Sequence, residues 1–244
     1  MFASRRSAQA LTQLPSGVRP LLLDLSAEYS AAESSSALHN AMVVCAIPPA
    51  LRSSGGGHYA MLLTRLTQLL QSAGSLGVVH FSSSGIYQGL AADVDESAEL
   101  CCEIDRVATL AQGEAILQQA LPLCISLRLG GLMGPGRHPG RFVAGKTLAN
   151  PDGLVNMLHA DDACRAVQRL LSSDGLQSAT YNLNSPLAIT RRQFYQAASK
   201  ALQTEVSFSD DVVISHRAVP LRFINQFAFQ YRFSNAIDAL SYCD

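Results

Sequence analysis

The sequence predicts an α/β fold built around a doubly wound, largely parallel sheet. Short apolar runs of strand length alternate with longer segments whose apolar residues recur at helical spacing, which is typical of repeated βαβ units. Hydrophobic residues make up 48% of the 244 residues and charged residues only 15%, so the chain can bury a sizeable core and is not disordered. This length suits one α/β domain with a small annex.

Five short, mostly apolar runs, and a possible sixth at the start of the chain, have the length and composition of strands. In chain order, we predict strands at 1–4, 21–25, 42–47, 78–82, 124–129 and 179–183.

Three segments between or after these runs predict helices with one buried face. Leucines recur at helical spacing within 62–70, and a similar apolar stripe runs through 163–171. A third helix starts at Thr190, because Thr190 and Gln193 have the spacing of a capping box.

Two late segments break the alternation and predict an annex on the substrate side. Residues 130–151 are rich in Gly and Pro, and the segment from Ser207 onward contains an aromatic stretch. We therefore divide the chain into a nucleotide-binding part, 1–134, and a substrate-side part, 135–244. A helix and a strand within 155–185 return to the sheet.

Charge and cysteine usage limit the partners and the compartment. The formal net charge is −1, so no general attraction to nucleic acid or to an anionic membrane is expected, and a small molecule is the expected partner. The six cysteines show no zinc spacing and are expected to be free thiols. No apolar run approaches the roughly 18 residues of a membrane span. These features favour a cytoplasmic protein, although residues 1–19 also have the composition of an organelle transit peptide.

Residues 140–147 match the phosphate-loop pattern G-x-x-x-x-G-K-[ST] letter for letter. Such a loop must leave a strand and enter a helix, so that backbone N–H groups point at the phosphates. Here Gly- and Pro-rich loops flank the pattern on both sides, so we interpret the match as chance.

One polar segment follows a predicted strand, where ligands bind in open parallel sheets, and a second contains His159 and two aspartates. Serines at 82–84 end the strand 78–82, and either a binding site or a simple turn explains them. His159 is more consistent with a structural role than with a catalytic base, and Asp161 or Asp162 is expected to cap the helix that follows.

In order and spacing, several segments resemble the NAD(P)-dependent epimerase/dehydratase family, the extended and atypical short-chain dehydrogenase/reductases. The segments are the S-S-x-x-V-Y-G-like 82–89, L-R-L-x-x-x-x-G-P-G-R at 127–137, H-x-D-D at 159–162 and Y-N-x-x from Tyr181. The resemblance covers nearly the whole chain. It implies a Rossmann-like sheet and an oxidoreductase that acts on a hydroxyl or carbonyl of a small polar or sugar-like substrate.

The resemblance also assigns roles to individual residues. Arg5 and Arg6 end the second family strand, where arginine implies a 2′-phosphate and hence NADP, with NAD as the alternative. Ser84 matches the catalytic Ser/Thr that hydrogen-bonds the substrate oxygen. Arg137 is placed at the opening of the substrate site, and Met133 lines the nicotinamide end of the cofactor site together with Gly131 and Leu132. The remaining implied cofactor-binding residues are Asp24, Leu25, Ala46, Ile47, Pro48, Ser82, Gly131 and Leu132.

The sequence departs from the family pattern in its acid–base pair. The family pairs a tyrosine with a lysine four residues later. The two lysines, Lys146 and Lys200, are preceded at that spacing by Phe and Gln. Matching the helix through Glu114 places Arg106 and Leu110 at the Tyr and Lys positions. Tyr59 and Tyr87 are the substitutes that we consider for the acid.

The second departure is the glycine-rich turn that follows the first family strand. The resemblance starts at the second strand, and we judge that neither 55–57 nor 131–136 has the strand-to-helix setting of such a turn. We therefore expect that the first βα unit is missing, either because the true start lies upstream or because the gene has lost this element. Loss of this central strand would forfeit on the order of 10 kcal/mol.

Three hypotheses of function follow from these observations. The first is an NADP-dependent oxidoreductase or epimerase-like enzyme. The second is a non-catalytic dinucleotide-binding or interaction protein that kept the fold, which the absent Tyr-x-x-x-Lys pair favours. The third, a nucleotide hydrolase that uses Lys146, depends on the phosphate-loop match alone.

Overall fold

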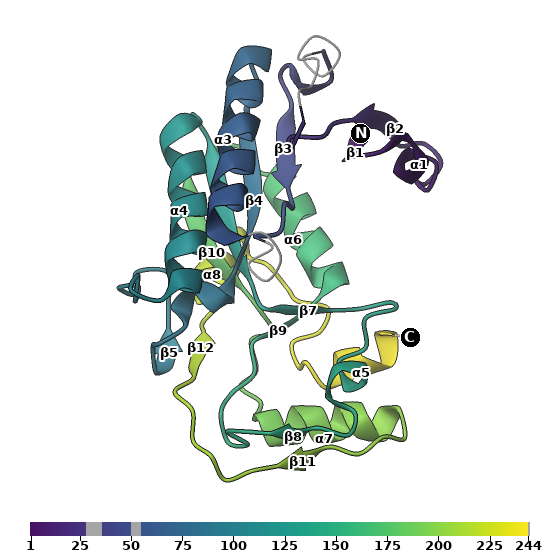
Figure 1. Ribbon diagram of the computed structural model, residues 1–244, viewed down its shortest axis with the longest axis vertical. Helices are drawn as coiled ribbons and strands as arrows, with labels where there is room; N and C mark the ends of the chain where they lie inside the picture. The colour runs from purple at the N-terminus through teal and green to yellow at the C-terminus, as the bar shows by residue number, and fades with distance from the viewer. Residues whose placement is uncertain (28–35, 50–54, 244) are drawn as a thin grey trace. The chain divides into compact units, whose positions relative to one another are not determined.

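The computed structural model describes residues 1–27, 36–49 and 55–243, and it confirms the α/β class with parallel strand pairing (Figure 1). The chain divides into two compact units that interleave along the sequence. Unit 1 comprises 1–80, 111–125 and 177–179, and unit 2 comprises 81–110, 126–176 and 180–244. The predicted division at residue 134 stays a prediction.

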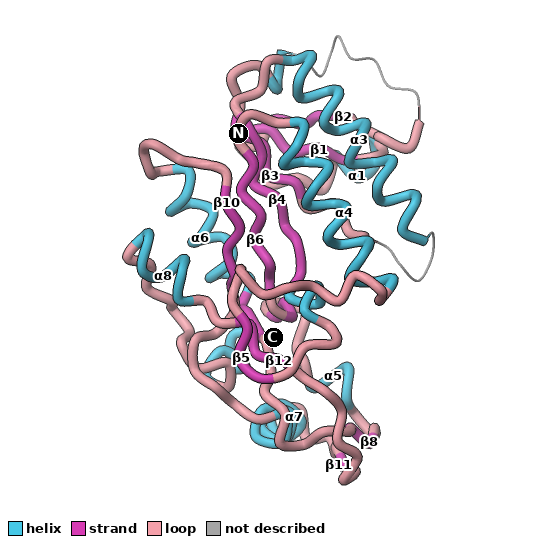
Figure 2. Tube along the Cα trace, turned by 90° about the vertical axis from the view of Figure 1, so that its left-hand side faces the viewer, coloured by secondary structure: helices cyan, strands magenta, loops and turns pink. Residues whose placement is uncertain are grey.

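A four-stranded sheet has the strand order β10-β6-β4-β3 (Figure 2). These strands are β3 (Met42–Cys45), β4 (Gly77–Ser83), β6 (Cys124–Leu129) and β10 (Ala179–Leu183). Strands β3 and β4 pair in parallel, with Met42 opposite Gly77 and Cys45 opposite His80. The predicted bounds of β6 and β10 are confirmed, whereas β3 ends two residues earlier than predicted.

Helix α3 (Gly55–Ala73) contributes more residues to the core of unit 1 than any other element, and helix α4 (Asp105–Ala120) contributes to it from Ala111 onward. The predicted leucine stripe is confirmed, because Leu63, Leu66, Leu69 and Leu70 are all buried. They pack in one cluster that also contains Val78, Leu117, Leu121 and Cys124. This spacing buries one face of α3, as an amphipathic helix requires.

Strands β1 (Phe2–Arg5) and β2 (Arg19–Leu22) form a separate two-stranded parallel sheet, connected through helix α1 (Ala8–Leu11). The predicted strand at 21–25 is shifted, because the carboxylate of Asp24 accepts hydrogen bonds from the backbone N–H and hydroxyl of Ser26, at 2.9 and 2.6 Å. Such a turn ends the extended backbone. The absence of a first βα unit stays a prediction.

Unit 2 contains three helices of seven residues or more that follow β9: α6 (Ala160–Leu171), α7 (Arg191–Ala201) and α8 (Leu221–Phe227). The predicted capping box of α7 is confirmed by reciprocal bonds between Thr190 and Gln193. The predicted Asp cap of α6 is wrong: Nδ1 of His159 accepts the bond from the Asp161 N–H at 3.2 Å. The Asp162 carboxylate instead accepts from the backbone N–H groups of Arg232 and Phe233.

Short elements complete unit 2. Three parallel two-stranded pairs join β5 (Ala92–Val94) to β12 (His216–Ala218), β7 (Gly131–Met133) to β9 (Met157–His159), and β8 (Thr147–Leu148) to β11 (Ser207–Phe208). The short helices are η1 (Ser84–Tyr87), α5 (Gly140–Val143) and η2 (Asp238–Tyr242). One core cluster contains Phe194, Ala198, Phe233 and Leu240.

The phosphate-loop match at 140–147 has the wrong structural context, as predicted. Gly140 begins the short helix α5 instead of following a strand, and Lys146 lies exposed before β8. A Cβ added at Gly140 would lie 3.0 Å from the backbone carbonyl carbon of Ala198, so this glycine permits close packing of α5 on α7. The segment therefore does not have the strand-to-helix geometry that a phosphate loop requires.

All six cysteines are free thiols, as predicted. In the described part of the chain, no helix combines the length and apolar character needed to cross a bilayer.

Candidate functional site

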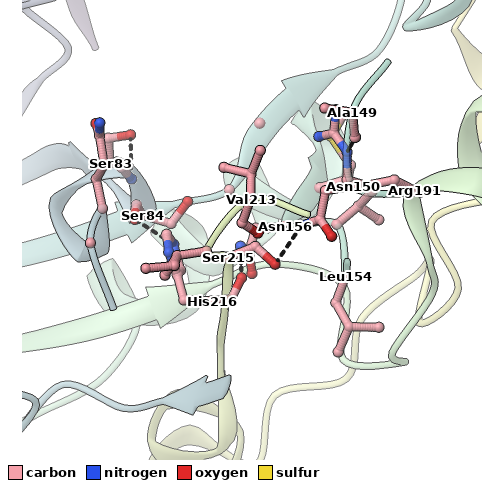
Figure 3. Close-up of a pocket in the computed structure, with 18 of the residues that line it drawn as sticks. Ser83, Ser84, Ala149, Asn150, Leu154, Asn156, Arg191, Val213, Ser215 and His216 are labelled. Carbon is pink, nitrogen blue, oxygen red and sulfur yellow. Dashed lines mark hydrogen bonds between the residues drawn. The ribbon is translucent and has the colours of Figure 1, made fainter. Parts of the chain in front are cut away.

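A cavity of about 620 Å³ lies within unit 2 (Figure 3). Its lining comes from six stretches of the chain, which include the carboxyl ends of β4 and β6, the start of α4 and the start of α7. The residues used below are Ser83, Ser84, Gly85, Arg106, Gly131, Asn150, Asn156, Arg191, Tyr195, Ser215 and His216. A cleft of this size accommodates a small organic ligand.

Ser84 lies where β4 ends and η1 begins, and only 7% of its surface is exposed. The hydroxyl of Ser83 accepts a hydrogen bond from the Gly85 N–H at 3.1 Å and caps this turn. The Ser84 backbone oxygen is 3.0 Å from Nε2 of His216. Among the described residues, no group bonds the Ser84 hydroxyl, so this donor and acceptor is available to a ligand.

His216 is held in place by its backbone and by its ring. The Asn156 side chain donates to the His216 carbonyl at 2.9 Å and accepts from the Ala218 N–H at 2.8 Å. The ring contacts the edge of Tyr87 at 5.7 Å between centroids. A carbonyl oxygen only accepts, so Nε2 carries the proton that is shared with Ser84, and neutral His216 has an unprotonated Nδ1.

Burial lowers the pKa of His216 from its ordinary value, and the nearby positive charge of Arg106 lowers it further, against the opposing effect of the bond to Ser84. Each cause that lowers the pKa disfavours the imidazolium. His216 is therefore a neutral imidazole at pH 7, fixed beside Ser84.

Arg106, which occupies the position expected for a catalytic tyrosine, lies at the start of α4 with its guanidinium against Gly85. A Cβ added at Gly85 would be 2.8 Å from both Cζ and Nε of Arg106. Leu110, at the position expected for lysine, is only 2% exposed. The family pair is thus replaced by a cation that lines the cavity and a leucine in the core.

Neither tyrosine considered as a substitute acid lines the cavity. Tyr87 is fully buried: its hydroxyl donates to the Asn182 side chain at 2.8 Å and accepts from Arg128 at 2.8 Å. Burial raises the pKa of Tyr87. Tyr59 is buried in unit 1 and bonds His80 at 2.9 Å. Tyr87 therefore has a structural role, and its bonds leave it no proton for a ligand.

The far end of the cavity is built by α7 and by the segment that precedes β12. Figure 3 shows Arg191, Ala149 and Asn150 at one end and Ser84 and His216 at the other. Arg191 donates to the Ala149 carbonyl at 3.1 Å, and its guanidinium lies 5.5 Å from the ring centroid of Tyr195. The Asn150 side chain donates to the Val213 carbonyl at 2.8 Å and to the Ser215 hydroxyl at 3.0 Å.

Of the other residues in unit 2 that the sequence assigned to the site, one lines the cavity and the others do not. Gly131 lines the cavity beside Gly130, whereas Leu132 lies outside its lining and Met133 is buried in the core cluster. Ser82 is buried in β4. Arg137 does not line the cavity: its Nε donates to the Leu132 carbonyl at 2.8 Å. Ser84 and Gly131 are thus the two predicted residues that the cavity brings together.

The residues assigned to the adenosine end of the dinucleotide lie in unit 1, at the ends of strands. Arg5 and Arg6 are exposed at the end of β1. The hydrogen bonds from Ser26 lower the pKa of Asp24, and the positive charge of Arg6 lowers it further. The Leu25 carbonyl accepts from Arg65 at 2.8 Å. Ala46, Ile47 and Pro48 follow β3, with Ala46 and Pro48 exposed.

These residues fit a dinucleotide in part. Two exposed arginines at the end of a parallel strand suit an anionic group on the ribose. Contrary to our expectation for residues 55–57, these glycines do stand at a helix start: they open α3, which follows β3. However, residues 46–54 separate them from the strand, so no tight strand–glycine–helix turn is present in the described residues. The pyrophosphate therefore lacks its usual cradle there.

Sequence reasoning missed Arg191, Tyr195, Asn156 and His216 as lining residues. Tyr195 is adjacent to Phe194 of the predicted inner stripe of α7, and helical periodicity alone does not separate a core residue from one at the edge of a cavity. His216 lies 132 positions after Ser84 in a segment without any motif. No local signal indicates such a contact.

The fold is that of NAD-dependent sugar epimerases and dehydratases, which confirms the resemblance at the level of the fold. MoeE5 in complex with UDP-glucuronic acid and NAD superposes with a TM-score of 0.77 at 19% identity, over 99% of this chain and 88% of MoeE5. The UDP-glucuronic acid 4-epimerase of Bacillus cereus, in complex with UDP-glucuronic acid and NAD, gives a TM-score of 0.75 at 15% identity, over 96% of this chain and 82% of that chain.

Among curated proteins, YeeZ of Escherichia coli K12 is 33% identical over 114 residues. This match covers 46% of the chain and 41% of YeeZ, so it spans about two fifths of the length of the curated relative. No protein-family model matches the chain.

Proposed function

We propose that the chain is an NAD(P)-dependent oxidoreductase or epimerase-like enzyme, and that the cavity of unit 2 holds a small polar or sugar-like substrate. The observation that carries this proposal is the placement of Ser84, with an uncommitted hydroxyl, at the carboxyl end of β4 in that cavity. In open α/β sheets, ligands bind beyond the carboxyl ends of the strands. The likeness to NAD-complexed epimerase structures supports the same reading.

In this proposal, Ser84 orients the substrate oxygen by donating its hydroxyl hydrogen. His216 is the residue best placed to accept a proton, because its Nδ1 is unprotonated and its ring is fixed by the bond to Ser84. A bound dinucleotide would supply the hydride chemistry at its nicotinamide. Asn156 holds the His216 backbone and thus acts as a positioning residue.

NADP is the cofactor that we favour over NAD. Arg5 and Arg6 place two positive charges at the end of β1, where a 2′-phosphate would lie in this type of fold. The MoeE5 and Bacillus cereus epimerase structures compared above are NAD complexes, so the preference for NADP rests on these two arginines. An Arg5→Ser/Arg6→Ser double variant should lose the preference for NADPH over NADH and leave NADH affinity unchanged.

A titration of the purified chain with NADPH, followed by nicotinamide fluorescence, tests the cofactor. If the chain binds, hydride transfer should be assayed with sugar and hydroxy-acid substrates. Ser84→Ala is expected to lower kcat/KM about a hundredfold, whereas Ser172→Ala, at an exposed serine outside the cavity, should leave it nearly unchanged. Absence of a fluorescence change with either dinucleotide would contradict the proposal.

The second candidate is a non-catalytic dinucleotide-binding or interaction protein with this fold. The observation that favours it is Leu110, which is buried where the family carries its lysine and does not line the cavity. In this case the chain binds dinucleotide but turns over no substrate. Turnover that disappears in Ser84→Ala would refute this candidate, since a binding protein has no rate to lose.

A further inference from the structure

Among its described lining residues, the cavity of unit 2 has positive charge and no carboxylate. Arg106 and Arg191 both line it, and its described lining residues include neither Asp nor Glu. Within the described residues, no hydrogen bond or ion pair engages the Arg106 guanidinium. Arg106 is an exposed residue of this lining, so its attraction for an anionic ligand is electrostatic and is weakened by salt.

The position of Arg106 directs this charge to one end of the cavity. Its guanidinium lies against the backbone of Gly85, the residue that follows Ser84, and it is near enough to His216 to lower the pKa of that ring. The second arginine that lines the cavity, Arg191, lies at the opposite end of the cavity, beside Asn150 (Figure 3). A ligand whose oxygen bonds Ser84 therefore places its adjacent substituent next to Arg106.

The neighbours of Arg106 at this end of the cavity are compatible with a bound anion. His216 is neutral and presents a lone pair instead of a competing carboxylate, and the Ser84 hydroxyl can donate to a ligand. A guanidinium presents paired donors that match the two oxygens of a carboxylate or phosphate.

We propose that this end of the cavity binds an anionic oxygen group of the substrate, a carboxylate or a phosphate next to the reacting hydroxyl, and that Arg106 is its specificity-determining residue. In this role, Arg106 is a binding group and not a proton donor, because a guanidinium keeps its proton throughout the ordinary pH range. The inference rests on the proposed function for the reacting hydroxyl, but binding of the anionic group to the cavity does not require bound dinucleotide.

A substitution at Gly85 tests the position of the Arg106 guanidinium without replacing Arg106 itself. Its φ is outside the left-handed region, so alanine is tolerated by the backbone, but the added methyl group would occupy the place of the guanidinium. Gly85→Ala should thus push Arg106 away from Ser84 while preserving the overall charge of the protein.

The test is calorimetric titration of the full 244-residue chain at low salt, without dinucleotide, with three matched sugars: D-glucose, D-glucuronate and D-glucose 6-phosphate. We expect at least one anionic sugar to bind about tenfold to a hundredfold more tightly than glucose, with the gap shrinking as salt is added. The two anionic arms show whether a carboxylate or a phosphate is preferred.

Variants then assign the effect to Arg106. Arg106→Gln and Gly85→Ala should each reduce the preference for the anionic sugar about tenfold or more, and Arg106→Lys should restore part of it. Arg141→Gln, at an exposed arginine outside the cavity, is the matched control and should retain the preference. Circular dichroism and thermal melts confirm that each variant is folded.

Equal affinity for charged and neutral sugars, no binding of either anionic sugar at millimolar concentration, or a preference that survives Arg106→Gln would each overturn the proposal. Because the titration contains no dinucleotide, these outcomes are separate from a failure to bind NADPH, which would count against the proposed function alone.

Discussion

Strands β3 and β6 are both apolar in sequence, yet they differ in how far their side chains are buried. Every residue of β6 is buried, whereas in β3 only Cys45 is buried and Val44 is 42% exposed. β6 has a strand on each side, β4 and β10, whereas β3 is the last strand of its sheet. An apolar run thus specifies a strand, but neighbours on both sides determine how much free energy its burial contributes.

Two buried polar networks also differ in how fully their groups are satisfied. In unit 2, Tyr87 bonds both Asn182 and Arg128, and the Asn182 N–H donates to Glu96 at 2.6 Å. In unit 1, His80 bonds Tyr59, but its Nδ1 has no partner among the described residues. A satisfied network stabilises one arrangement, while a half-satisfied buried imidazole makes stability depend on pH.

The largest expected effect separates β6 from β3. Ile125→Ala removes a fully buried side chain, and we expect the free energy of unfolding to fall by about 2 to 5 kcal/mol. Val44→Ala, at the exposed edge position, should cost about 0.5 kcal/mol or less. Urea unfolding followed by circular dichroism measures both. Similar losses at the two positions would mean that β3 is covered in solution.

The next effect is the pH dependence of His80. Burial lowers its pKa from 6.5 to about 4, so the unfolded chain binds this proton more readily than the folded chain does. The free energy of unfolding should therefore be highest above pH 6.5 and fall by about 3 kcal/mol between pH 6.5 and pH 4.

Urea unfolding at a series of pH values measures this dependence. His80→Gln should flatten the curve in that window, whereas His58→Gln leaves His80 in place and should keep the slope of the unsubstituted chain. A slope that persists in His80→Gln would assign the pH dependence to other groups.

A smaller effect is expected from the network in unit 2. Tyr87→Phe keeps the ring but removes the hydroxyl that donates to Asn182 and accepts from Arg128, and we expect a cost of about 1 to 3 kcal/mol. Tyr242→Phe, at a half-exposed tyrosine, should change stability by less than about 0.5 kcal/mol. Equal costs would show that the buried network contributes nothing specific.

The smallest effect compares two helix caps. Thr190→Ala removes the bond that the Thr190 hydroxyl accepts from the Gln193 N–H, but it keeps the bond from the backbone N–H of residue 190 to the Gln193 side chain. It should cost about 1 kcal/mol. Ser7→Ala removes the single cap bond of the four-residue helix α1, at 3.3 Å, and should cost only a few tenths of a kcal/mol. Thermal unfolding measures both, and the reverse order would contradict the difference in helix length and packing.

Much of the fold was readable from the sequence because its determinants are local. The bounds of β6 and β10, the leucine stripe of α3 and the capping box of α7 depend on residues within one strand or one or two helical turns. The errors also have local causes: β2 ends early because Asp24 bonds Ser26, and α6 is capped by His159 instead of an aspartate. Several residue types satisfy the same helix end, so the sequence alone did not choose among them.

The sequence by itself determined the α/β class, most strands and helices, and the placement of Ser84 at a strand end, because these follow from apolar periodicity and short-range hydrogen bonds. Only the tertiary structure decided that Arg106 lies against Gly85, that His216 lies beside Ser84, and that Tyr87 bonds Asn182 and Arg128. Those contacts join residues from 21 to 132 positions apart. They arise from packing of whole elements, which leaves no periodic signal along the chain.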